Sequence, residues 1–158
     1  MKHKKLFVTL GATFALFLAI ITAASFYLVD YALVSVQRAR DSDMSKIEKR
    51  FPAVKPWLDS LRAAGALRDT FVVMPQTGKR AHALYVRSPH AEGRTAVLVH
   101  GYGDNATSML PIARIYNREM NANVLLPDLY AHGQSDGEAI QMGWKDRLDV
   151  LHWISLAP

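Results

Sequence analysis

Thr95-Ala-Val-Leu-Val-His-Gly-Tyr-Gly103 is the stretch of this 158-residue chain that decides its fold. A continuous uncharged run leads into a loop with two glycines, which predicts a buried strand that ends in a sharp bend. Residues 105–120 have helical periodicity, Val124-Leu-Leu126 is a second buried strand, and residues 141–156 form a second amphipathic helix. Strand, helix, strand and helix in this order predict a parallel sheet with crossover helices.

A hairpin precedes this unit. Two β-like runs, Thr70–Met74 and Ala81–Val86, flank the turn Pro75-Gln-Thr-Gly78. We therefore expect an α/β domain over residues 69–158, made of a hairpin and the start of a mostly parallel sheet with flanking helices. Each helix is expected to turn its larger apolar side chains inward: Met109, Ile112, Ile115 and Tyr116 in the first, and Trp144, Leu148, Leu151 and Ile154 in the second.

The loops that follow the two strands are the candidate site, because ligands of such sheets bind at the carboxyl ends of the strands. The first loop is His100-Gly-Tyr-Gly-Asp-Asn105, and the second runs from Pro127 to Gly137. Gly101 and Gly103 let the backbone bend and approach a ligand closely. A loop of this kind can direct an N–H group at a developing negative oxygen.

At these residues the chain resembles the α/β-hydrolase superfamily, and more narrowly its serine-aminopeptidase-like and monoacylglycerol-lipase-like branches. Val97-Leu-Val-His-Gly-Tyr-Gly103 is similar to the family's strand and His-Gly oxyanion loop. Pro127-Asp-Leu-Tyr-Ala-His-Gly-Gln-Ser135 is similar to its Asp-x-Arg-Gly-His-Gly-x-Ser segment, with Tyr130 and Ala131 at the arginine and first-glycine positions. The resemblance covers roughly residues 69–158. It implies a serine hydrolase of ester, thioester or amide bonds that takes a small acyl or peptide substrate and needs no metal or organic cofactor.

The resemblance also implies roles for single residues. The backbone N–H of Tyr102 is expected to contribute to the oxyanion hole, and Asp128 is expected to order the loop beneath the site. The residues expected to shape the two loops are His100, Gly101, Gly103, Asp128, His132 and Gly133. A catalytic base at His100 is one alternative. A metal site is another, although its candidate ligands lack a known spacing: His100, Asp104, Asp128 and His132. Three further histidines are expected at the surface or in packing: His82, His90 and His152.

Gly133-Gln-Ser-Asp-Gly137 matches the nucleophile pattern Gly-x-Ser-x-Gly. That pattern has meaning where a strand runs directly into the first glycine and a helix begins at the serine. Here six residues separate the strand from Gly133, and the next helical periodicity begins after Gly137. Ser135 is therefore interpreted as a turn residue that caps local backbone groups, and a nucleophile is the alternative interpretation.

The family's chain order is serine, carboxylate and histidine, so all three are expected beyond residue 158, and the chain as given is expected to be inactive. An interrupted gene, an incomplete sequence and a real truncated product are the alternative explanations. A non-catalytic, membrane-anchored binding module is the alternative function, using an exposed strand edge or the juxtamembrane helices. The sheet is expected to be marginally stable, with the strand at 95–99 best protected.

Leu6 to Val29 is a run of 24 residues without a charge, long enough for a helix to cross a bilayer. Residues 1–5 precede it as a basic flank, which favours a cytoplasmic N-terminus and export of the domain to the periplasmic or extracellular side. A cleaved signal peptide is the alternative, with small residues at Ala23, Ala24 and Ser25, but the apolar run is longer than a signal core. A buried core helix is the third interpretation.

Residues 30–68 are expected to be a juxtamembrane helical segment. Ser45-Lys-Ile-Glu48 has capping-box spacing and predicts a helix that begins there. Pro56 predicts the first turn of a second helix, which Gly65 ends and which turns Trp57, Leu58 and Leu61 inward.

Composition excludes several classes of protein. The chain has no cysteine, so it contains neither a disulfide framework nor a thiolate metal site. Of the net charge of +5, Lys2, Lys4 and Lys5 contribute three, which leaves only +2 for residues 6–158. Because no later stretch concentrates basic residues among aromatics, nucleic acid is not an expected partner.

Overall fold

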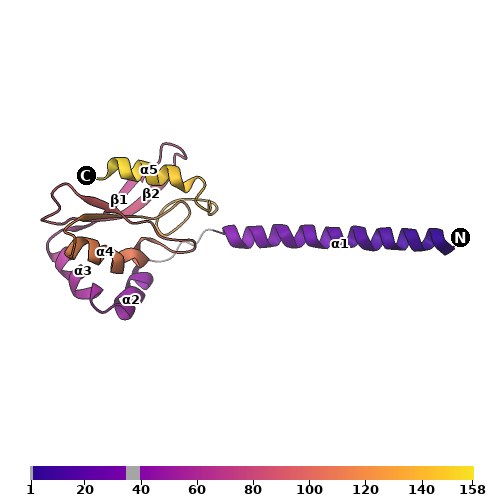
Figure 1. The fold of residues 1–158 in the computed structure, drawn as a ribbon, viewed down its shortest axis with the longest axis horizontal. Coiled ribbons are helices and arrows are strands. Elements are labelled where there is room, and N and C mark those ends of the chain that lie inside the picture. The colour runs from indigo at the N-terminus through magenta and orange to yellow at the C-terminus, as the bar shows by residue number, and fades with distance from the viewer. Residues whose placement is uncertain (1, 35–39) are drawn as a thin grey trace. The chain divides into compact units, whose positions relative to one another are not determined.

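The computed structural model describes residues 2–34 and 40–158. The chain divides into two compact units, Met1–Val34 and Ser35–Pro158. The first unit is a single helix, α1 (Lys2–Leu33), drawn in indigo and violet in Figure 1. Its stretch Lys4–Leu33 is long and apolar enough to cross a membrane, which a signal sequence would also be. Met1 of the expected basic flank and residues 35–39 of the expected juxtamembrane segment lie outside the described residues.

The second unit is built on a four-stranded sheet in the order β1-β2-β4-β3. The hairpin of β1 (Leu67–Val73) and β2 (Arg80–Val86) is antiparallel, as predicted. β4 (Asn123–Pro127) pairs antiparallel with β2 and parallel with β3 (Thr95–Val97), with Thr95 opposite Asn123 and Val97 opposite Leu125. The parallel pair and its crossover helix fit the predicted α/β organisation. The sheet of the described residues is mixed rather than mostly parallel, because β2 pairs antiparallel with both β1 and β4.

β3 differs from the predicted strand at 95–99 in length and burial. It ends at Val97, although the N–H of Leu98 still donates to the Leu125 carbonyl oxygen. Its three residues are half-buried, whereas all five residues of β4 are buried. The difference follows from position, because β4 lies between two strands and β3 pairs with β4 alone among the described residues.

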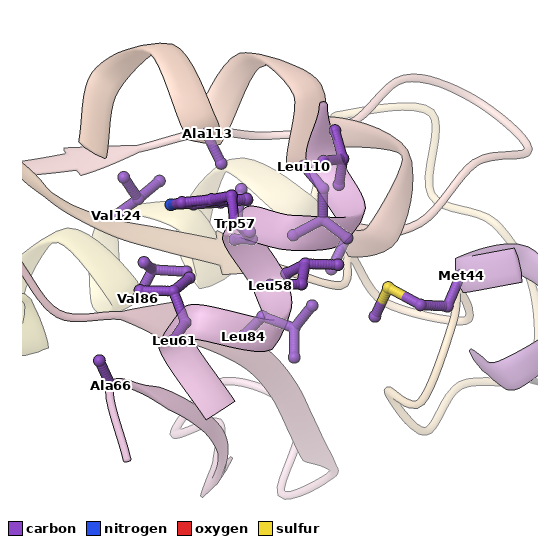
Figure 2. Packing of buried hydrophobic residues seen from close by; sticks show 13 residues of the cluster. Met44, Trp57, Leu58, Leu61, Ala66, Leu84, Val86, Leu110, Ala113 and Val124 are labelled. Carbon is purple, nitrogen blue, oxygen red and sulfur yellow. The ribbon is translucent and has the colours of Figure 1, made fainter. Parts of the chain in front are cut away.

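Three helical segments cover one face of the sheet: α2 (Arg40–Arg50), α3 (Val54–Ala63) and α4 (Leu110–Arg118), and α4 follows the 3₁₀ turn η1 (Ala106–Met109). Figure 1 shows these helices on the side of the sheet opposite α5 (Asp146–Leu156). The larger core lies beneath them, where Trp57 and Leu58 of α3 form one buried cluster with residues that include Leu84 of β2, Ala113 of α4 and Val124 of β4 (Figure 2).

α3 is the helix that the sequence predicted best. Trp57, Leu58 and Leu61 are all buried, as expected. The helix ends where Gly65 adopts a φ of +60°, a left-handed conformation that costs glycine little. The N–H of Ala66 then donates to the Leu61 carbonyl oxygen, which satisfies a terminal group of the helix. The prediction of a helix that begins at Ser45 is wrong, because Ser45 lies in the middle of α2.

The predicted inward face of α4 is partly wrong. Met109 and Tyr116 pack against the core, but the Ile112 and Ile115 side chains are exposed. The helix instead turns Leu110 and the small Ala113 toward the sheet, and both are fully buried. A small residue at the contact lets helix and sheet approach closely, which a count of large apolar side chains does not anticipate.

The predicted inward face of α5 is wrong. The four residues expected to be inward are exposed to differing degrees: Trp144, Leu148, Leu151 and Ile154. The helix begins at Asp146 rather than at residue 141 and buries Trp153 against Met74, Ala83 and Leu125. A tryptophan offers more apolar area than any of the leucines, so its burial sets the rotation of the helix.

Substitution of Trp153 and, as a matched control, of Trp144 tests which face of α5 is buried. Replacing Trp153, which is 2% exposed, by alanine is expected to destabilise the chain by about 3–5 kcal/mol, the usual cost of emptying a buried aromatic site. Replacing Trp144, which is 72% exposed, is expected to cost less than about 1 kcal/mol, mostly through its contact with Arg147. Urea unfolding followed by far-ultraviolet circular dichroism measures both. Equal losses, or a larger loss for W144A, would contradict the observed packing.

Candidate functional site

Two loops meet at one edge of the sheet, because β3 and β4 are parallel and end side by side. The first loop, residues 98–105, leads into η1, and the second, residues 128–137, follows β4. Both were predicted from the sequence as the candidate site. Their arrangement depends on side chains that lie beneath them.

The carboxylate of Asp128 joins three segments of the chain. Its Oδ1 accepts the N–H of Ala106 at 2.7 Å, and its Oδ2 accepts the N–H of Gln134 at 2.9 Å. Oδ2 also lies 2.7 Å from Nδ1 of His82 on β2. Asp128 is 3% exposed, so these hydrogen bonds replace the water that its charge would otherwise need. Asp128 thus connects the second loop to η1 and β2, and its role in ordering the loop beneath the site stays a prediction.

The same carboxylate leaves no space for a side chain at position 133. Gly133 has a φ of +51°, and a Cβ at this position would lie 2.3 Å from three atoms of the Asp128 side chain. The loop therefore closes over Asp128 only with glycine here. This gives a physical reason for the loop-shaping role expected of Gly133.

His82 lies between two carboxylates. Its Nδ1 contacts Asp128 and its Nε2 lies 2.9 Å from Oδ1 of Asp69 on β1. The ring therefore bridges β1 and the second loop, with one carboxylate group at each of its nitrogens. Sequence reasoning placed His82 at the surface or in packing, and it is buried. The sequence around His82 does not indicate its two acidic partners, because they lie 13 and 46 residues away along the chain.

Ser135 is buried within this arrangement. Its Oγ accepts the backbone N–H of His82 at 2.9 Å and donates to the backbone carbonyl oxygen of Asp128 at 2.7 Å. The hydroxyl is 1% exposed and is held between two strands' ends rather than against an imidazole nitrogen. This geometry favours the interpretation of Ser135 as a residue that fixes the loop.

His100 and His132 connect the two loops through hydrogen bonds, and we call this pair of histidines the latch. Nδ1 of His100 donates to the Gly101 carbonyl oxygen at 2.8 Å, so its Nε2 is free to accept the N–H of Leu129 at 3.0 Å. Likewise Nδ1 of His132 lies 2.9 Å from the Tyr130 carbonyl oxygen, and its Nε2 accepts the N–H of Gly103 at 3.4 Å. Each imidazole thus belongs to one loop and binds the backbone of the other, and the rings pack edge to face.

Above this latch is a pocket of about 430 Å³. Tyr102 lines it, with its side chain 62% exposed, and Gly103 beside it has a φ of +67°. The pocket is walled mainly by apolar residues: Val99, Leu129, Ile140, Met142 and Val150. The structure therefore brings Tyr102, His100 and His132 together at one opening, while Asp128 and Ser135 lie outside its lining.

The first turns of α5 place two carboxylates on its buried face. Oδ2 of Asp146 accepts the N–H of Gly143, but Oδ1 of Asp146 and Oδ1 of Asp149 have no hydrogen-bond partner among the described residues. Burial, together with the nearby charge of Asp146, raises the pKa of Asp149. Sequence reasoning missed both residues, because it assigned this face of the helix to leucines. Within residues 2–34 and 40–158, no cluster of three or more potential metal ligands is found.

No protein-family model matches the sequence, and no curated protein matches it. Several solved structures, in contrast, are similar to this chain. An esterase of Pyrococcus furiosus, Pf2001, is similar over 57% of this chain at 22% identity, with TM-scores of 0.51 and 0.52 in two crystal forms. An alpha-beta hydrolase from Vibrio vulnificus is similar over 63% of the chain at 18% identity, with a TM-score of 0.46 over 33% of its own length.

The chain contains part of an α/β-hydrolase fold. The esterase similarity and the mixed sheet with helices on both faces support this conclusion together. The chain spans about a third of the esterase's length, 34% and 35% in the two crystal forms. This similarity shows the predicted fold, whereas membership of the superfamily and of its narrower branches is a matter for proposal.

The latch between the loops is expected to make residues 35–158 sensitive to acid. Burial, the largest influence, lowers the pKa of His100 below its ordinary value of 6.5. In the unfolded chain, His100 therefore binds a proton as the pH falls through about 6.5, whereas in the folded chain it binds that proton only at a lower pH. The stability that neutral His100 confers is complete above that pH and is lost as the pH falls from there toward the lower pKa of the folded state.

We expect the melting temperature to fall when the pH is lowered from about 7.5 to about 5.5, a window that spans the ordinary histidine pKa. His100→Gln, which cannot titrate there, is expected to be less stable at the higher pH but to show a smaller acid-induced fall. Differential scanning fluorimetry of both chains measures this. An equal fall in the two chains would show that the latch does not carry the effect.

Proposed function

We propose that this chain is part of a serine hydrolase that cleaves an ester, thioester or amide bond, and that it contributes one donor to the oxyanion hole of that enzyme. The observation that carries the proposal is the position of Tyr102. It lies in a glycine-flanked bend at the carboxyl end of β3, beside an apolar pocket and above two imidazoles engaged in loop contacts. The backbone N–H of Tyr102 is assigned to the substrate's carbonyl oxygen, which becomes negative in the transition state.

The remaining chemistry is assigned to groups outside residues 1–158. A serine activated by histidine, itself oriented by a carboxylate, would attack the carbonyl carbon. Ser135 is not proposed for this role, because both of its hydrogen-bonding directions are used within the loop. The pocket's apolar lining fits a small acyl or peptide substrate.

The proposal extends to location. We assign α1 to the bilayer as an uncleaved anchor, with residues 6–29 in the hydrocarbon region and the lysine-rich start on the cytoplasmic side. The hydrolase segment would then lie on the periplasmic or extracellular side. The length and apolar composition of the helix support this assignment, and the basic flank supports its direction.

A binding module without catalysis is the second candidate. One observation favours it: among the described residues, β3 pairs only with β4, so its other edge offers unpaired backbone groups. An extended segment of a partner could add to this edge as a further strand. The two candidates differ in what a longer reading frame would encode, since only the first requires a reactive serine.

The experiment compares the 158-residue chain with the chain extended by whatever its gene encodes after codon 158. Membranes from cells that express each are washed with alkaline carbonate and treated with a fluorophosphonate probe. Both chains are expected to stay in the washed membranes at full size, since a cleaved signal would shorten them. Only the extended chain is expected to be labelled.

In the extended chain, Tyr102→Pro removes the proposed N–H donor and is expected to lower kcat on an activated ester by about 100–1000-fold. Tyr102→Phe keeps the donor and serves as the control. Labelling of the short chain at Ser135 would overturn the assignment. An extended chain that is never labelled would favour the binding module.

A further inference from the structure

A second pocket, of about 280 Å³, lies away from the loops at the carboxyl ends of β3 and β4. It is bounded by α3, by residues 87–90 after β2, and by the end of α4. Its apolar side is formed by Trp57 and Leu61. None of the residues that line it belongs to the pocket beside Tyr102.

The charged side chains that line this second pocket have one sign. Arg87 and Arg118 line it, and no aspartate or glutamate within residues 2–34 and 40–158 does. Both arginines are exposed, and neither forms an ion pair with another described residue. Other arginines of the chain, such as Arg62 and Arg80, do have acidic partners. The two guanidinium groups therefore keep their hydrogen-bond donors available at the pocket.

The buried polar side chains of the pocket wall are hydrogen-bonded within the chain. Trp57 Nε1 donates to Oδ1 of Asn117 at 3.0 Å, and Nδ2 of Asn117 donates to the Ala122 carbonyl oxygen at 3.2 Å. The N–H of Ser88 donates to Oδ1 of Asn123 at 2.9 Å, while the Ser88 hydroxyl accepts the N–H of His90. The Ser88 hydroxyl proton thus has no acceptor among the described residues and can be donated to a ligand.

The C-terminal ends of α3 and α4 weaken the binding of an anion at this pocket, but only slightly. Each helix presents about half a negative charge at its C-terminus. Some of the last carbonyl oxygens are occupied: that of Leu61 accepts the N–H of Ala66, and that of Ile115 accepts the N–H of Glu119. Two full guanidinium charges outweigh these partial charges.

We infer that this pocket binds a phosphate group, with Arg87 and Arg118 as its two cationic ligands and the Ser88 hydroxyl as a neutral donor. Guanidinium groups match phosphate oxygens in pairs, and Trp57 and Leu61 provide a surface for the small apolar part of a phosphorylated molecule. The volume is at the lower end for ligand pockets, so the ligand is small. A soluble phosphate ester and the headgroup of an anionic phospholipid share this chemistry.

The test uses the whole chain in nanodiscs and phosphate-free buffer, and follows the amide signals of Ser88 and Asn121 by nuclear magnetic resonance. In discs of phosphatidylcholine, inorganic phosphate and then glycerol phosphate are titrated. In a second arm the discs contain phosphatidylglycerol and no phosphate is added. Arg87→Gln and Arg118→Gln are the site variants. Lys145→Gln, which removes one exposed positive charge at the start of α5, is the control.

Saturable shifts in the first arm, weakened about tenfold or more by either arginine variant and unchanged by the control, are expected for a soluble ligand. Shifts in the second arm alone, with the same dependence on both arginines, assign the site to a lipid headgroup. Shifts that do not saturate, or that weaken equally in all variants including the control, would overturn the inference. Folding of the variants is checked by the unchanged amide signals of β4.

Discussion

The buried carboxylate of Asp128 is the constraint on which the candidate site depends. It binds the start of η1 through Ala106, the second loop through Gln134, and the hairpin through His82. A buried charge is costly unless several donors satisfy it, so this group draws the three segments together. Gly133 packs directly on it. The positions of Tyr102 and of the pocket above it follow from where Asp128 holds the two loops.

Much of the fold could be predicted because it depends on local patterns. The hairpin, the buried strand at 124–126 and the end of α3 at Gly65 each have a short-range signal: alternation, a continuous apolar run, and a glycine after a helix. The two loops of the site were predicted for the same reason, since Gly101, Gly103 and Gly133 mark bends. The esterase similarity supports the α/β-hydrolase fold that these motifs indicated.

The errors arose where tertiary packing decides between faces of similar apolarity. Sequence periodicity chose Leu148 and Leu151 for the inner face of α5, but burial of Trp153 rotates the helix and carries Asp149 inward with it. The partners of His82 could not be predicted either, because Asp69 and Asp128 are distant in sequence. Charged contacts of this kind depend on strand register, which has no local signal.

Native-state hydrogen exchange in an Asp128→Asn chain tests the central claim most directly. Asparagine keeps the shape of the side chain but replaces one acceptor oxygen with a donor. We predict faster exchange of the amides of Ala106 and Gln134 together, and of Leu129 and Gly103 in the latch, while α3 stays protected. An Asp136→Asn chain, which loses only a partly exposed ion pair to Arg80, should exchange as the parent does. Loss of protection confined to Gln134, with Ala106 and the first loop unchanged, would contradict the account.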